Sequence, residues 1–317
     1  MNYGDLIRDA FRITLHNRYL WFFGFFAGGS TGFNFSGNLP SGSNFNPNNW
    51  QRPGADLSGL TAQVGQGILS NALLIFGIVV VVVLLVLLFI IMWIISQGAL
   101  ADSVAAIDRG EGRRFGSTFA PGIANFWRVF GYFIVFLLIS IGLIVVIGIP
   151  VALLIGGTFA ATQSVGARVL VAVIVGILAI LLLIVVFIPL TIIAQYALRE
   201  IVVRRERVVG SVGSGYGLFR RNIGRSLLLW LIHLGLSIGL GIAFLLLLLI
   251  VGLVLFIPTI ALAVAGYSTA AIITGVIAGL ILLPVVLVAA GALGTFSHAY
   301  WTLAYLRLTA PPTPSPG

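Results

Sequence analysis

The chain has 317 residues, of which 60% are hydrophobic and 8% are charged, and its 17 Lys and Arg residues outnumber its 8 Asp and Glu residues. A soluble globule of this length needs more polar surface, so the composition excludes that class and predicts an all-α polytopic membrane protein. The net charge of +9 does not indicate nucleic-acid binding, because the basic residues, all Arg, are concentrated in alternate connections between apolar segments. The absence of cysteine excludes disulfides and thiolate metal sites.

The N-terminal part of the chain predicts an amphipathic helix followed by a short apolar segment. Over residues 4–18, Leu6 and Ile13 share a helical face from which the charged residues are mostly absent, so we expect a helix lying in the headgroup plane. Residues 19–29 are apolar and aromatic but short for a crossing, so this span must recruit neighbouring residues or the bilayer must thin. Residues 30–66, rich in Asn, Gly, Ser and Pro, predict an irregular extracytoplasmic loop.

Five further apolar segments are each long enough to cross a bilayer. They cover residues 68–96, 128–155, 169–195, 227–265 and 270–306. Together with the first segment they predict six transmembrane helices, arranged as three pseudo-repeated hairpins that each follow an amphipathic helix. We expect one transmembrane domain over residues 1–308, with units of approximately 4–98, 99–198 and 199–308, and a disordered Pro-rich tail over 309–317.

The repeat is clearest in the stretches that leave one apolar segment and enter the next. Gln97, Ala99, Leu100, Asp102, Asp108, Arg109 and Gly112 correspond, 98 positions later, to Gln195, Ala197, Leu198, Glu200, Glu206, Arg207 and Gly210. An aromatic residue six positions before an asparagine recurs at Phe119/Asn125 and Tyr216/Asn222, and more faintly at Phe11/Asn17. Self-similarity at a fixed period predicts a repeat architecture.

The arginines predict the orientation. Fifteen of them lie before residue 19, in 99–128, in 199–225 or after 306, and only Arg52 and Arg168 lie in the other connections. By the positive-inside rule the first set is cytoplasmic, which predicts six spans in a bacterial cytoplasmic membrane with both termini inside.

A polar cluster is predicted at the cytoplasmic ends of the spans. Asp102 and Glu200 stand at matched positions where a helix ends, and an acid there opposes the helix dipole unless a cation offsets it. Arg128 and Arg225, at matched re-entry positions, are the expected partners. The cluster is either a structural clamp or a ring that contacts a ligand.

The predicted spans contain few titratable side chains. His233 is the titratable group placed well within a span, and Ser237, one turn further on, is a candidate hydrogen-bond partner. A neutral histidine bonded to a neighbouring helix is the favoured interpretation. His16, His233 and His298 could bind a metal only if they converged, and no metal, cofactor or catalytic site is predicted. The pairs Gly24/Gly28, Gly235/Gly239 and Gly275/Gly279 have the spacing of close-packing helix faces, and we expect the last two to pack within the third hairpin.

The alternation of arginine-bearing amphipathic helices with apolar hairpins resembles a group of bacterial multi-pass proteins of unknown role. It is similar in style to the membrane domain of the glycerophosphoryl diester phosphodiesterase family. The aromatic–Asn entry and the acidic exit carry the resemblance, which covers most of residues 1–308. The catalytic domain of that family is missing here, so the resemblance implies no enzymatic activity.

We therefore expect a non-enzymatic membrane protein that organises lipid or a partner membrane protein. Its partners would be membrane lipids and, as a second class, another membrane protein. The arginines expected to contact anionic headgroups are Arg199, Arg204, Arg205, Arg207, Arg220, Arg221 and Arg225. The alternative is a transporter or permease for an apolar or zwitterionic solute, with a path between the repeats.

Overall fold

The computed structural model describes residues 2–28 and 72–310, and every regular element within them is an α-helix. In chain order these are α1 (Tyr3–His16), α2 (Leu20–Ala27), α4 (Ala72–Asp108), α5 (Phe115–Ala124), α6 (Phe126–Ala161), α7 (Val165–Val203), α8 (Val208–Arg221), α9 (Ile223–Val264) and α10 (Ser268–Thr309). The predicted loop at residues 30–66 and most of the predicted tail lie outside the described residues.

Five of the described helices are long and apolar enough to cross a membrane, namely α4, α6, α7, α9 and α10. Each has 36 to 42 residues, so at 1.5 Å per residue each is about 55 to 63 Å long and extends well beyond a hydrocarbon core of about 30 Å. The predicted first span is different, because α2 has only eight residues and is about 12 Å long. The described residues therefore contain five candidate spans, and the part of the predicted first span beyond Gly28 lies outside them.

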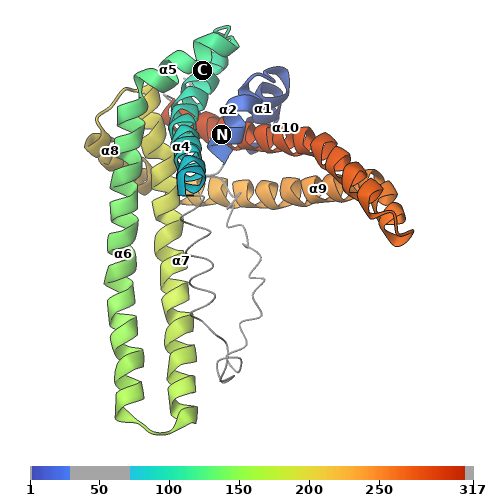
Figure 1. Ribbon diagram of the computed structural model, residues 1–317. Helices are drawn as coiled ribbons and strands as arrows, with labels where there is room; N and C mark the ends of the chain where they lie inside the picture. Colours follow the sequence, from blue (N-terminus) through green and yellow to red (C-terminus); the bar gives the residue numbers. More distant parts are fainter. Residues whose placement is uncertain (1, 29–71, 311–317) are drawn as a thin grey trace.

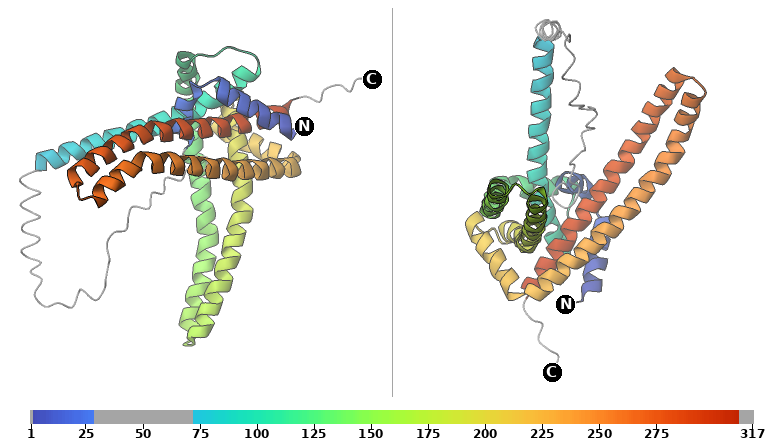
Figure 2. Two further views of the ribbon diagram at one scale, coloured as in Figure 1. Left: turned by 90° about the vertical axis from the view of Figure 1, so that its right-hand side faces the viewer. Right: turned by 90° about the horizontal axis from the view of Figure 1, so that it is seen from below.

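The helices form a hub from which three arms diverge (Figures 1 and 2). The hub consists of residues 94–106 of α4, 192–202 of α7 and 291–305 of α10, together with α1, α2, α5 and α8. The paired helices α6 and α7 form one arm, α9 and α10 form a second, and the N-terminal part of α4 forms the third (Figure 1). The arms point in different directions and do not run side by side as a closed bundle (Figure 2).

The side chains explain why the chain packs in the hub and not between the arms. The hub is rich in small, polar and aromatic residues, and Ala99, Tyr196 and Trp301 in it are almost completely buried. The arms are built of Leu, Ile and Val, and side chains such as Val83 and Leu178 remain about half exposed. In lipid, such side chains gain little by leaving the acyl chains for another helix, whereas small and polar residues allow close approach and hydrogen bonds. Packing specificity is therefore confined to the hub.

Three short helices, α1, α5 and α8, precede the long helices of the three predicted units, and we call them the entry helices. Each ends at an asparagine, and the Nδ2 groups of Asn17, Asn125 and Asn222 donate to the backbone carbonyl four residues earlier at 3.0, 2.9 and 3.2 Å. This side-chain bond satisfies one of the carbonyls that a helix C-terminus leaves unpaired. The asparagine of the repeated sequence pattern thus has the same local role at three places.

The entry helices pack on the ends of the long helices in a cyclic order. α5 lies on α4, α8 lies on α7, and α1 lies on α10, which brings the first and last helices of the chain together. Gly122 of α5 faces the backbone of α4 at Ile95. An ion pair between Asp9 of α1 and Arg307 of α10 closes the N-terminal contact.

Of the three glycine pairs with close-packing spacing, Gly24/Gly28 faces another helix closely, and the two pairs expected to pack in the third hairpin mostly do not. Nothing lies within 4 Å of a Cβ built on Gly235, Gly239 or Gly279, and Gly275 alone approaches the partner helix, with Thr259 at 3.3 Å. The tight crossing lies instead between α2 and α10, where Gly24 faces the backbone of Gly291. The prediction for the third hairpin was wrong because small-residue spacing marks a face without identifying the helix that covers it.

Two prolines stand where an arm joins the hub. Pro189 lies within α7 just before Ile192, the first fully buried residue of that helix, and Pro284 precedes the buried Gly291 of α10. Proline removes one backbone hydrogen bond and bends a helix. These are the positions at which the direction of an arm relative to the hub is least constrained.

Candidate functional site

A polar centre lies where the C-terminal parts of α4, α7 and α10 converge. Gln97 of α4 and His298 of α10 are 1% exposed, and Gln195 of α7 is partly buried. The Nε2 of Gln97 donates to the carbonyl of Ala27 at 3.0 Å. Each of these residues follows a small residue at the same stage of its helix, so the three helices place one polar side chain each in the centre of the hub.

Arg199 is the most unusual residue of this centre, because its side chain is fully buried. Its Nη1 donates to the backbone carbonyl of Gln195 at 2.9 Å and also to the side-chain oxygen of Gln195. Its Nε donates to Oγ1 of Thr302 on α10 at 3.4 Å. Its Nη2 has no hydrogen-bond partner. Sequence analysis placed this arginine among the exposed headgroup contacts, and the structure corrects that assignment.

The charge of Arg199 has no acidic partner among the described residues. Glu200, its neighbour in sequence, pairs instead with Arg204 at 3.6 Å. A guanidinium keeps its proton under physiological conditions, so the hub contains a buried cation held only by neutral acceptors. Such a charge is costly unless an anion or further hydrogen bonds compensate it.

His233 lies against this centre from α9. Its Nε2 is 2.7 Å from Oγ of Ser297 on α10, and its ring packs beside Tyr300 and Trp301 with centroids 5.3 and 5.5 Å away. The histidine therefore bonds a neighbouring helix, as expected, but its partner is Ser297 and not Ser237. Within residues 2–28 and 72–310, no group of three His, Cys, Asp or Glu side chains is placed to hold a metal ion.

A cavity of about 190 Å³ adjoins the polar centre between α4, α6 and α7. Gln97 and Gln195 line it, as does Tyr132, whose hydroxyl donates to the carbonyl of Ala194 at 2.9 Å. Its remaining lining residues are Phe133, Phe136, Ser140, Phe187, Leu190, Thr191, Ala194 and Leu198. The cavity thus has a polar end at the two glutamines and an apolar end in the arm.

The predicted clamp pairs are not formed. Asp102 pairs with Arg113 at 2.9 Å, and Glu200 pairs with Arg204. Arg128 and Arg225 are exposed, and each lies near the start of a long helix, away from these acids. Arg113 comes back to Asp102 from the connector between α4 and α5, residues 109–114. Arg204 begins the connector between α7 and α8, residues 204–207, and meets Glu200 because it lies one helical turn further along the chain.

Each connector contains a residue with left-handed backbone. Gly110 has φ of 82° in the first connector, and Arg205 has φ of 56° in the second. In the first connector, the hydrogen bond that Arg109 donates to Glu111 holds the pKa of that carboxyl below its ordinary value. Each connector therefore combines a sharp turn with at least one local ion pair.

Two of the predicted headgroup arginines, Arg204 and Arg221, line a second cavity, of about 320 Å³, between α7, α8 and the end of α10. The guanidinium of Arg204 also lies over the ring of Tyr305 at 5.9 Å. The other lining residues are Glu200, Ser214, Leu218, Asn222, Leu308 and Thr309. Arg205, Arg207 and Arg220 are exposed outside this cavity.

Sequence reasoning missed the polar centre. The available signal was the similarity of Ser297–His298 in α10 to Ser96–Gln97 in α4, two Ser-polar pairs in the C-terminal parts of long helices. The contact between Arg199 and Thr302 joins two helices about a hundred residues apart in sequence, and spacing alone does not reveal such a contact.

Together, the five long apolar helices and the polar hub at their shared ends define a polytopic α-helical membrane protein. Residues 19–311 match the model of a family of unknown function, DUF7544, and the chain belongs to that family. The match gives no link to the phosphodiesterase-associated membrane domain. No curated protein matches the chain. No solved structure matches it either.

Proposed function

We propose that this protein is a non-enzymatic membrane component that holds anionic lipid headgroups at the arginine-bearing end of its hub. The observation that carries the proposal is the cavity lined by Arg204 and Arg221. Two arginines against the single carboxylate of Glu200 give its lining a net positive charge. Asn222 adds a side-chain amide, which donates one N–H to the carbonyl of Leu218 and has a second N–H that suits a phosphate oxygen. The hydroxyls of Ser214 and Thr309, which also line the cavity, donate to Glu206 and to the carbonyl of Tyr305.

The position of this cavity suits a headgroup. The part of α10 that precedes the hub, residues 268–290, is about 35 Å long, close to the thickness of a hydrocarbon core. The hub and its arginines then lie at one face of the bilayer. A cation at an anionic surface contributes about 1 kcal/mol of attraction, and a partly enclosed pair of arginines contributes more because the local dielectric is lower.

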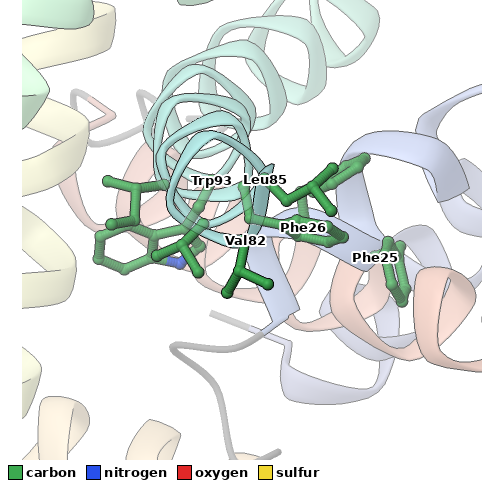
Figure 3. Close-up of a pocket in the computed structure, with 8 residues that line it drawn as sticks. Phe25, Phe26, Val82, Leu85 and Trp93 are labelled. Carbon is green, nitrogen blue, oxygen red and sulfur yellow. The ribbon is translucent and has the colours of Figure 1, made fainter. Parts of the chain in front are cut away.

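An apolar groove between α2 and the arm formed by α4 supports a role in accommodating lipid (Figure 3). It has a volume of about 520 Å³ and lies between α2, which contributes Phe25 and Phe26, and α4, which contributes Val82, Leu85 and Trp93 among others (Figure 3). From Val82 to Trp93 the helix rises about 16 Å. A groove of this length with hydrocarbon lining matches a lipid acyl chain.

We also propose that the hub is built from three copies of one unit. The common bond made by Asn17, Asn125 and Asn222 and the cyclic packing of the entry helices support this arrangement. Each unit would contribute an entry helix, an outgoing span and a returning span that ends in the polar centre.

The topology of six spans with both termini in the cytoplasm is the first expected result. Reporters placed in the turns near Gln163 and Tyr267 should report an external location, and a reporter after Gly317 a cytoplasmic one, because the arginines collect at the hub end. An external C-terminal reporter would contradict the orientation.

The headgroup site predicts a specific loss on substitution of Arg221. Arg221→Gln should weaken the affinity for a fluorescent short-chain phosphatidylglycerol in uncharged detergent by about five- to tenfold, since it removes a cavity cation worth about 1 kcal/mol or more. Arg128→Gln, which removes the same charge from an exposed site outside the cavity, is the matched control and should change the affinity less than about twofold. Equal losses in the two variants would reduce the site to general surface charge.

A permease for an apolar or zwitterionic solute is the second candidate function. The cavity beside Gln97 and Gln195 favours it, since it extends from the polar centre to Ser140 in α6. The described arms point in different directions and do not run together as a bundle around this cavity (Figure 2), so we favour lipid organisation.

A further inference from the structure

The buried guanidinium of Arg199 has one nitrogen without a partner and a positive charge without a counterion. Gln195 and Thr302 satisfy three of its donor contacts with neutral oxygens, and Nη2 has no partner. Among the described acids, the nearest in sequence, Glu200, is engaged with Arg204. A buried cation in this state is compensated best by an anion that the protein itself does not supply.

The cavity between α4, α6 and α7 reaches this cation through Gln195. Long side chains of a helix lean toward its N-terminus, and the two bonds to Gln195 show that the guanidinium of Arg199 lies one turn back along α7. Gln195 also lines the cavity. With its carbonyl oxygen bound to the guanidinium, the Gln195 amide is polarised and becomes a stronger donor from its N–H groups.

The other polar groups at this cavity are neutral. Thr191 and Ser140 contribute hydroxyls, and Tyr132 contributes a hydroxyl bonded to Ala194. No carboxylate lines the cavity within the described part of the chain. Its volume of about 190 Å³ is well above the roughly 10–15 Å³ that one water requires, so a tetrahedral oxyanion with part of its hydration fits.

We propose that this cavity is an oxyanion site, in which a phosphate group is held by Gln195 and by the field of Arg199. The phosphate is either that of a lipid headgroup or free inorganic phosphate. This site lies on the opposite side of α7's end from the cavity of Arg204 and Arg221, so it is distinct from the headgroup site proposed above and does not depend on it.

The decisive variant places a negative charge beside Arg199 in the protein itself. Gln195→Glu places a carboxylate oxygen where the amide oxygen now accepts from Arg199, so the cation is neutralised without a ligand. We expect this variant to melt several degrees above the wild type in phosphate-free uncharged detergent, because a buried unpaired charge becomes a buried hydrogen-bonded pair. It should bind phosphate at least about tenfold more weakly than the wild type.

The experiment measures the melting temperature of the full chain against rising concentrations of each probe at constant ionic strength. Inorganic phosphate and a short-chain phosphatidic acid form the two arms, and a ligand that binds only the folded state raises the melting temperature saturably. A rise with both probes indicates a site for phosphate in general, and a rise with the lipid alone identifies a headgroup. Arg221→Gln should keep the full rise, which separates this site from the proposed headgroup cavity.

Two results would overturn the proposal. The first is a wild-type melting temperature that neither probe raises. The second is an undiminished rise in Gln195→Glu. If Gln195→Glu does not fold, Arg199→Met removes the charge while keeping an unbranched stem, and it should abolish the rise because the cation that attracts the phosphate is gone. A rise that survives in Arg199→Met would likewise refute the site.

Discussion

Replacing Gly294 by valine is expected to prevent α2 from packing on α10 and to leave little folded protein. A Cβ at Gly294 would lie well under 3.0 Å from the carbonyl oxygen and carbon of Gly24. These atoms belong to the backbone of a helix and cannot move aside as a flexible side chain would. We expect a loss of about 4 kcal/mol or more, the range reached when a core position is severely overpacked.

The loss of stability should be large because α2 and α10 can approach this closely only where both helices have glycine. A Cβ at Gly24 would meet the carbonyl of Gly291, and one at Gly291 would meet the carbonyl of Trp21. The close approach also allows Oγ1 of Thr295 to donate to the carbonyl of Leu20 at 3.0 Å. Separating the two helices therefore removes a cross-helix hydrogen bond together with the packing.

Gly279→Val is the matched control. Gly279 lies on the same helix, and nothing is within 4 Å of a Cβ built there, so the substitution should change stability by less than about 0.5 kcal/mol. Thermal unfolding in detergent, followed by circular dichroism, measures both variants. Similar melting temperatures for Gly294→Val and the wild type would show that α2 does not depend on this crossing.

The sequence was sufficient for the membrane class and for the approximate positions of the five long helices, because composition and apolar length depend on the chain alone. It placed the ends of α4, α6 and α7 too early, since these helices continue to Asp108, Ala161 and Val203. The helix predicted over 4–18 appears as α1, and the segment predicted over 169–195 lies within α7. The first span could not be settled in this way, since α2 ends after eight residues at Ala27. Hydropathy could not predict that the arms diverge. They diverge because their Leu- and Val-rich segments make few specific contacts with one another.

The candidate site was predictable only in part. Asp102 and Glu200 were identified as acids that need a cationic partner, but Arg113 and Arg204 fill that role. Arg113 reaches Asp102 because the connector turns at Gly110, and Arg204 reaches Glu200 because it lies one helical turn further on. Arg199 resembled its neighbouring arginines in sequence and differs from them only in being buried. Burial of a charge is a property of the packed helices around it, so a single sequence pattern cannot distinguish it.

Removal of the Trp301 side chain should be the second most damaging change. Trp301 is 2% exposed and stands where α7, α9 and α10 meet. Its ring lies 6.2 Å from Tyr196 of α7, 5.5 Å from His233 of α9 and 5.9 Å from Tyr300 of its own helix. Trp301→Ala leaves a cavity in the hub and should cost about 3–5 kcal/mol.

The comparison with Trp127→Ala tests where the stability of this molecule resides. Trp127 is 77% exposed at the start of α6, so its removal should cost less than about 0.5 kcal/mol in detergent. Because α6, α7, α9 and α10 contact one another only weakly outside their own arms, the hub must hold the arms together. Loss of Trp301 should therefore unfold α7, α9 and α10 in one transition at a lower temperature. If Trp301→Ala instead melts like Trp127→Ala, contacts in the arms contribute more to stability than contacts in the hub.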